Sequence, residues 1–167
     1  MEHPSISQLR KLVGVGNYQF GKGVGSVLFD GKLQVKCSKR TGRIRHIYIR
    51  GKLMATLRPK DGLLAFTPEG AGMVLSRFSE PPNLVVVDSS VRDAIRHGGD
   101  VFAKHVRRAE RDLRPGEEVI IADEEGILLG VGSAVLSGHE MIVFKRGVAV
   151  NLRKGVDEAS PAESDAS

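Results

Sequence analysis

The sequence predicts an α+β fold in two parts: a small N-terminal α+β part with an antiparallel sheet, then a C-terminal part that forms a small β-barrel. Apolar and polar residues alternate between residues 33 and 66 and are interrupted by turn signals, which is typical of an antiparallel meander. Several short strands and one helix follow within roughly 70 residues, a density that favours a barrel over a βαβ sheet. The length of 167 residues allows two small domains.

The N-terminal part is expected to begin with a helix. Ser5 or Ser7 is a suitable N-cap, apolar residues then recur at helical spacing, and Gly14 is the expected end. A second short helix within residues 17–29 is an alternative to a glycine-rich loop there.

The meander should contain three or four strands, at residues 33–37, 43–50, 53–57 and 63–66. Thr67 and Pro68 then provide an N-cap and a first helical residue. Two prolines end this helix and coincide with a change in net charge, so we expect a domain boundary near Pro82. The predicted first domain is therefore residues 1–82, a basic α+β domain.

The second domain is predicted at residues 83–154. We expect strands at residues 84–87, 101–106, 119–122, 127–136, 141–144 and 148–152, and a short helix that Asp88 or Ser89 caps and that ends near His97. Residues 155–167 combine Ala, Ser, Glu and Asp without an aromatic residue and are predicted to be a disordered acidic tail.

Charge is distributed unevenly. The chain has 25 Lys+Arg and 20 Asp+Glu, yet residues 1–82 carry a net charge of +9, residues 83–154 carry 0 and residues 155–167 carry −4. Nine basic residues and no acid lie between Lys36 and Lys60. We expect these cations to project from one face of the sheet, where they suit a polyanion such as nucleic acid or an anionic membrane. The alternative is a solvated basic face.

The sequence lacks the residues that a disulfide, a zinc site or a Walker A loop requires. The single cysteine, Cys37, excludes an intramolecular disulfide and a thiolate zinc site, and the five histidines are scattered. Residues 16–23 match a Walker A loop up to the lysine, but Gly23 stands where Ser or Thr is needed. No apolar run approaches the roughly 20 residues of a membrane span, and no signal peptide is visible. We therefore expect a cytoplasmic protein that has no cofactor or metal and is not an enzyme.

An ordered series of motifs marks the second domain. In chain order these are Leu84-Val85-Val86-Val87-Asp88, residues 91–97, Gly98-Gly99-Asp100-Val101-Phe102-Ala103-Lys104, Leu113-Arg114-Pro115-Gly116-Glu117-Glu118-Val119, Leu129-Gly130-Val131-Gly132-Ser133-Ala134 and Lys145-Arg146-Gly147-Val148-Ala149-Val150. Together they make this segment resemble a PUA domain, the pseudo-barrel of pseudouridine synthases and archaeosine tRNA-guanine transglycosylases.

The first domain resembles the one that precedes PUA in the archaeosine transglycosylases. The similar stretches are Asn17-Tyr18-Gln19-Phe20-Gly21-Lys22-Gly23, Ser38-Lys39-Arg40-Thr41-Gly42-Arg43-Ile44-Arg45 and Leu57-Arg58-Pro59-Lys60-Asp61-Gly62-Leu63. Asn17 departs from the family's usual Asp. The family's catalytic barrel would need well over the 167 residues present.

The resemblance implies tRNA binding at the acceptor stem and the 3′ end. Carried over position by position, the PUA site would comprise Gly98, Gly99, Phe102, Ala103 and Lys104, with Arg146 and Gly147 opposite. Core packing is the alternative role for Phe102, and an unengaged surface lysine is the alternative for Lys104. The cations expected along an RNA stem are Lys39, Arg40, Arg43 and Arg45.

The resulting hypothesis is a non-catalytic RNA-binding protein, with tRNA as the RNA and a separate catalytic transglycosylase chain as a partner. A ribosome-associated assembly factor that binds ribosomal RNA, a stand-alone RNA-modifying enzyme and a protein-binding adaptor are the alternatives. They differ in which RNA is bound and in whether the single chain turns over RNA.

Overall fold

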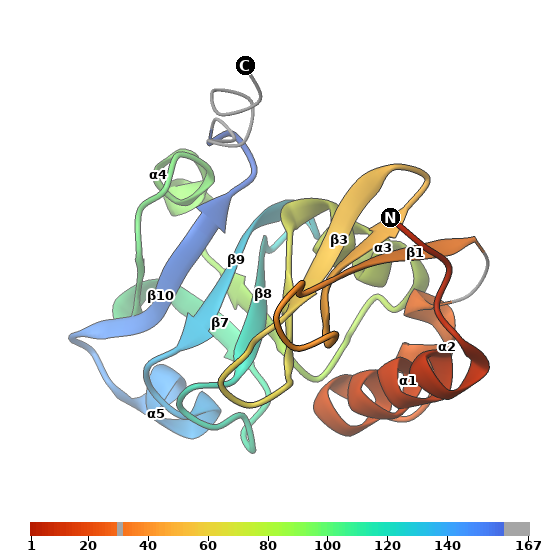
Figure 1. The fold of residues 1–167 in the computed structure, drawn as a ribbon. Helices are drawn as coiled ribbons and strands as arrows, with labels where there is room; N and C mark the ends of the chain where they lie inside the picture. Colours follow the sequence, from red (N-terminus) through yellow and green to blue (C-terminus); the bar gives the residue numbers. More distant parts are fainter. Residues whose placement is uncertain (30–31, 159–167) are drawn as a thin grey trace.

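The computed structural model describes residues 1–29 and 32–158, which form an N-terminal half with a four-stranded sheet and a C-terminal half with a six-stranded sheet (Figure 1). The helices of the N-terminal half are α1 (Ile6–Phe20), α2 (Val24–Leu28) and α3 (Pro68–Arg77). Its strands are β1 (Leu33–Cys37), β2 (Ile44–Ile49), β3 (Lys52–Leu57) and β4 (Leu64–Phe66). They pair antiparallel in sequence order, so the meander is confirmed.

Helix α1 is longer than predicted. Its N-cap is Ser5, whose side chain forms a capping box with Gln8, but the helix runs past Gly14 to Phe20. The predicted end was wrong because the glycines beyond it serve helix packing. A Cβ on Gly16 would lie 2.7 Å from the Cα atom of Gly25 in α2, so only glycine allows the two helices this approach.

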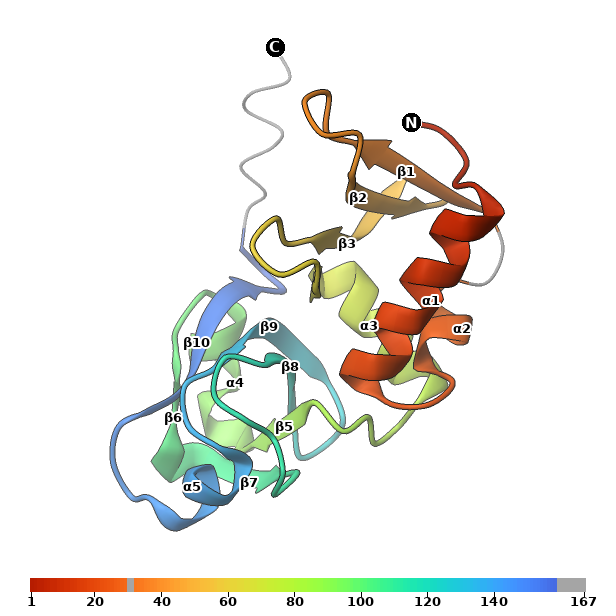
Figure 2. The same cartoon turned by 60° about the horizontal axis from the view of Figure 1, so that its bottom comes forward.

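The C-terminal half is a curled six-stranded sheet with the order β6-β10-β9-β8-β5-β7 (Figure 2). Its strands are β5 (Leu84–Val87), β6 (Val101–Phe102), β7 (Val106–Ala109), β8 (Glu118–Asp123), β9 (Leu128–Ala134) and β10 (Val148–Gly155). Its helices are η1 (Ser89–Val91), α4 (Arg92–Arg96), η2 (Ala103–His105) and α5 (Gly138–Val143). The pairing of β5 with β8 is parallel, and the others are antiparallel.

Two predicted strands of this half were wrong. The strand expected at residues 101–106 is divided by η2 into β6 and the start of β7. The strand expected at residues 141–144 belongs to α5, because the Ser137 hydroxyl accepts the Glu140 backbone N–H and the Glu140 carboxylate accepts the Ser137 N–H. This capping box satisfies helical amides that a strand would leave free.

Strand β5 explains why four consecutive residues are apolar. Leu84 and Val86 belong to the core of the N-terminal half, whereas Val85 and Val87 belong to the core inside the barrel. Both faces of the strand are therefore buried, and alternation with polar residues is absent for that reason. The two halves consequently share one apolar contact surface.

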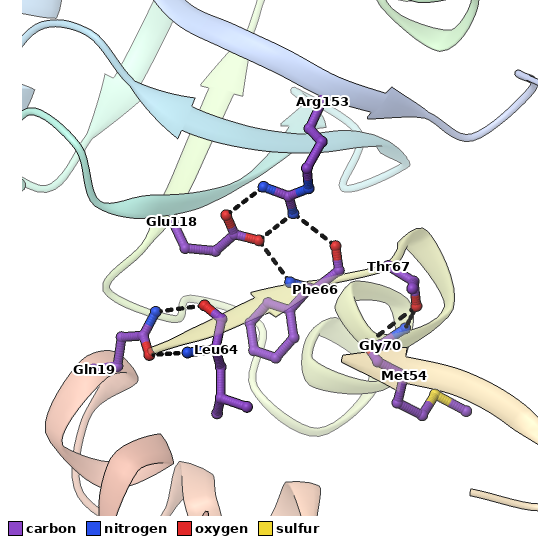
Figure 3. Close-up of polar contacts among 8 residues, drawn as sticks. All are labelled: Gln19, Met54, Leu64, Phe66, Thr67, Gly70, Glu118 and Arg153. Atoms are coloured by element: carbon purple, nitrogen blue, oxygen red, sulfur yellow. Dashed lines mark hydrogen bonds and ion pairs between the residues drawn. The ribbon is translucent and has the colours of Figure 1, made fainter. Parts of the chain in front are cut away.

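The free edge of β4 is completed by side chains (Figure 3). The Gln19 amide donates to the Leu64 carbonyl (2.7 Å) and accepts the Leu64 N–H (2.8 Å). Two residues farther along, the Glu118 carboxylate accepts the Phe66 N–H (2.6 Å) and the Arg153 guanidinium donates to the Phe66 carbonyl (2.7 Å). The edge groups that would otherwise be unpaired thus obtain partners from α1, β8 and β10.

Glu118 and Arg153 also form an ion pair with each other. One guanidinium nitrogen donates to Glu118 Oε1 at 2.7 Å and the other contacts Oε2 closely. The Glu118 side chain is fully buried, whereas that of Arg153 keeps 39% of its surface exposed. Burial raises the pKa of the Glu118 carboxyl, and Arg153 and the Phe66 N–H oppose this rise. The carboxylate therefore depends on Arg153 for its charge.

The β1–β2 and β3–β4 turns share one geometry. In each, the first residue and the sixth are joined by a hydrogen bond of 2.8 Å, from the Ser38 N–H to Arg43 and from the Arg58 N–H to Leu63. The fifth residue is a glycine with positive φ, +70° at Gly42 and +72° at Gly62. Both turns lie at the same end of the meander.

We expect Arg153→Ala to lower the free energy of unfolding by about 3 kcal/mol, because Glu118 stays buried without its ion-pair partner. Urea denaturation followed by circular dichroism measures this decrease. The matched control is Arg111→Ala, at an exposed arginine, which should change stability by less than about 0.5 kcal/mol.

The destabilisation should depend on pH. The pKa of the Glu118 carboxyl is higher in the folded than in the unfolded chain, so its protonated form favours folding. The loss of stability caused by burying the charged carboxylate is therefore full above the folded pKa. It disappears as the pH falls toward the unfolded pKa. The deficit of Arg153→Ala should therefore be smaller at about pH 5 than at about pH 8. Equal deficits would contradict the role of Glu118.

Gly62→Ala should destabilise the fold by about 1 kcal/mol, because φ at this position is in the left-handed region. Gly62→Asn should destabilise the fold less.

Gly14→Ala is the opposite case: the residue lies inside α1 with no atom within 4 Å of an added Cβ, so we expect stability to rise by about 0.5–1 kcal/mol. Thermal denaturation measures both changes in stability, which should have opposite signs.

Candidate nucleic-acid interface

A cleft of about 830 Å³ lies between α1 and the two matched turns. We call it the turn cleft, and it is lined by Gln8, Lys11, Leu12, Val15, residues 40–45 and residues 57–63. Six of these residues are cations: Lys11, Arg40, Arg43, Arg45, Arg58 and Lys60. The described lining contains a single carboxylate, Asp61, which already pairs with Arg58 at 2.9 Å. The cleft therefore favours an anionic ligand.

The predicted cations are only partly brought together. Arg40, Arg43 and Arg45 line the turn cleft, whereas Lys39 is exposed outside its lining. The expectation of one basic sheet face was wrong. Most cations of residues 36–60 lie in turns or at strand ends, and Arg50 and Lys52 occupy the opposite end of the meander from the two matched turns. One face of the sheet is apolar because it packs on the core.

A second group of predicted residues meets at the β6 edge of the barrel. The Ala103 N–H donates to the Gly147 carbonyl (2.9 Å), and Phe102 pairs with Val148 in the β6–β10 ladder. This arrangement places Phe102, Ala103 and Lys104 beside the turn that contains Arg146 and Gly147. Phe102 is 46% exposed, so the core-packing alternative for it was wrong. Ala103 is buried and can contribute only its backbone.

Gly98 and Gly99 lie farther along the same edge. Their N–H groups already donate to Ile95 and Ala94 at the end of α4 (3.0 and 2.8 Å). The residues after β10 cover this loop: the Arg96 guanidinium pairs with Asp157 at 2.7 Å, and a Cβ on Gly98 would collide with the Glu158 carboxylate. The sequence predicts disorder from residue 155 onward; residues 155–158 are placed here, and 159–167 lie outside the described residues.

Sequence reasoning missed an exposed apolar group at the end of α5, which packs on η2, the turn that directly follows Phe102. Helix α5 packs against η2, and Ile142, Val143 and Phe144 at its C-terminal end are 48%, 53% and 44% exposed. Lys145 and Arg146 follow directly in sequence. The signal that would have placed α5 was the Ser137-to-Glu140 spacing of a capping box. Its consequence is an exposed apolar group bordered by cations, which suits an unpaired base and its phosphate.

Three other expectations concern a metal site, a phosphate loop and a membrane span. Across residues 1–29 and 32–158, no group of three or more His, Cys, Asp or Glu side chains is placed to hold a metal ion. The Walker-like stretch does not form a phosphate loop, because residues 16–20 belong to α1. In the described parts of the chain, no helix combines the length and the apolar character that crossing a bilayer requires.

Family comparisons match both halves. Residues 10–82 match the patch-forming domain C2 of tRNA-guanine transglycosylase, and residues 83–156 match the PUA domain. The chain is 38% identical over 148 residues to the tRNA-guanine(15) transglycosylase of Methanobrevibacter smithii and 40% identical over 147 residues to that of Pyrococcus furiosus. These alignments cover 89% and 88% of this chain but 22% and 25% of the relatives. The chain thus spans about a quarter of their length.

Solved structures support the fold. A hypothetical protein of Pyrococcus horikoshii matches with a TM-score of 0.76 and 23% identity, over 93% of this chain and 94% of that one. A conserved PUA-domain protein of Thermoplasma acidophilum matches with a TM-score of 0.67 and 22% identity, over 92% of each chain. With a C2 half and a PUA half in this order, the chain is a PUA-domain protein similar to the C-terminal region of the tRNA-guanine transglycosylases.

Proposed function

We propose that the chain is a non-catalytic RNA-binding protein that holds tRNA by its acceptor stem and its unpaired 3′ end. The observation that carries this proposal is the β6 edge, where the exposed Phe102 ring lies beside Lys104 and the Arg146 turn. An aromatic face stacks on any base, and the adjacent cations neutralise phosphates. The similarity to enzymes named for tRNA supports tRNA as the RNA.

The turn cleft supplies the second contact in this proposal. Arg40, Arg43 and Arg45 would engage the RNA backbone, which carries one negative charge per nucleotide. The two surfaces belong to different halves, and the Glu118–Arg153–Phe66 contact joins those halves. The turn cleft and the β6 edge would therefore lie at a fixed distance from each other when one RNA binds both.

We also propose that the bound RNA is presented to a transglycosylase whose catalytic domain is on a separate chain. The 38–40% identity to one quarter of such enzymes supports this partnership. Native co-purification with a catalytic chain, or a change in that chain's activity on mixing, would support it. Neither effect, together with a preference for ribosomal RNA over tRNA, would favour a ribosome-associated role.

The proposal is tested first by binding the chain to a whole tRNA and to the same tRNA without its 3′ single strand, over a series of salt concentrations. We expect tight, salt-sensitive binding that weakens when the 3′ strand is removed. Binding that ignores the 3′ strand would remove the acceptor-end assignment. Turnover of tRNA by the single chain would contradict the non-catalytic role.

Phe102→Ala should weaken binding to tRNA with an intact 3′ end by roughly ten-fold, because one base loses its stacking partner. Binding to the shortened tRNA should hardly change, and the free energy of unfolding should fall by no more than about 1 kcal/mol because 46% of Phe102 is already exposed. Fluorescence anisotropy measures both affinities. Ile6→Ala, at an exposed apolar residue of α1, is the matched control. Equal weakening on both RNAs would contradict the stacking role.

Arg43→Glu combined with Arg45→Glu should weaken binding to all tRNAs by a similar factor. The slope of log affinity against log salt should flatten by about one unit for each phosphate that the protein no longer neutralises. Arg77→Glu with Arg111→Glu makes the same change in net charge at exposed arginines outside the turn cleft. If both pairs of substitutions changed the slope equally, the effect would come from net charge alone.

A further inference from the structure

We propose that the turn cleft holds unpaired nucleotides of an RNA strand, with bases on its apolar floor and phosphates on its cationic rim. This inference rests on the proposed RNA-binding function and deepens it, because phosphate contacts along a stem require no apolar floor. It adds a second single-strand site, in the C2 half, to the one proposed at the β6 edge.

The size and shape of the turn cleft favour single nucleotides. Its volume of about 830 Å³ lies in the range of pockets that enclose small organic ligands, roughly 300–1,000 Å³. One or two nucleotides fit in such a volume, whereas a base-paired A-form helix is far too wide to enter it. A stem could touch only the outer rim and would leave the floor empty.

The floor is apolar. Leu12 and Val15 of α1, Ile44 at the start of β2, and Leu57 and Leu63 beside the β3–β4 turn line the cleft. All but Leu12 are partly exposed there, which leaves apolar surface for a ligand to cover. The flat faces of nucleobases bury well against such a surface, and phosphates do not.

The rim completes the chemistry of a nucleotide. Four of its six cations are arginines, whose planar guanidinium groups bind phosphate through two hydrogen bonds and also stack on bases. Arg58 is oriented by its ion pair with Asp61, and Asp61 in turn accepts the Leu63 N–H at 3.0 Å. Four of the six cations lie in the two glycine turns, whereas α1 and β2 contribute one each.

The experiment uses the full chain and three probes: a hexauridylate that contains 4-thiouridine, a blunt-ended RNA duplex, and hexaglutamate as a competitor. Affinities are measured by anisotropy, and photocrosslinks are mapped by mass spectrometry. We expect hexauridylate to crosslink within residues 8–15 or 57–63 as well as near Phe102. The duplex should give no crosslinks on the cleft floor, and hexaglutamate should compete weakly.

Val15→Phe narrows the cleft floor without a change in charge and should reduce the crosslinks there while those near Phe102 persist. Val27→Phe, at a half-buried valine of α2 outside the cleft, is its matched control. Arg40→Gln with Arg43→Gln leaves the core unchanged and should weaken hexauridylate binding at the cleft about ten-fold. This second variant keeps the test valid if Val15→Phe fails to fold.

The outcomes separate the inference from the proposed function. Crosslinks near Phe102 alone would overturn the cleft site and leave the proposed function standing. Crosslinks to the floor from the duplex, or full competition by hexaglutamate, would overturn the preference for unpaired nucleotides. If no RNA bound at all, both the inference and the proposed function would fall.

Discussion

The hydrogen bonds that Glu118 and Arg153 make to Phe66 hold the molecule together as one unit. They connect β4, the last strand of the N-terminal sheet, to β8 and β10 of the barrel. They also provide partners for the N–H and the carbonyl of an edge residue. A fully buried carboxylate is tolerated there because a guanidinium and a backbone amide surround it. The Gln19 side chain likewise binds both backbone groups of Leu64. Side chains thus take the hydrogen-bonding positions along β4 that a fifth strand would occupy.

This junction fixes the position of the two candidate RNA surfaces relative to each other. The turn cleft depends on α1 and on the turn that leads into β4, and the β6 edge depends on β10, which also contains Arg153. Each surface combines apolar contact area with cations, the combination that unpaired nucleotides require. Six of the 14 basic residues in residues 1–82 lie around one cleft, because helix packing and two glycine turns bring them together.

The two main errors of prediction have different physical causes. Local composition alone predicts a helix end at Gly14 and a strand at residues 141–144, and both predictions are wrong. Helix α1 continues because Gly16 allows contact with α2, and α5 forms because Ser137 and Glu140 cap its first turn. In the first case the deciding partner lies elsewhere in the chain, whereas in the second a readable local signal was overlooked.

The sequence by itself determined the antiparallel meander, the glycine turns, the two halves' resemblance to C2 and PUA domains, and the excess of cations in the first half. These follow from local hydrogen bonding, backbone conformation and motif order. Only the tertiary structure decided that both faces of β5 are buried, that Phe102 is exposed and that Arg40, Arg43 and Arg45 surround a cleft. Those features depend on contacts between distant residues, such as Phe66 with Arg153, 87 positions apart.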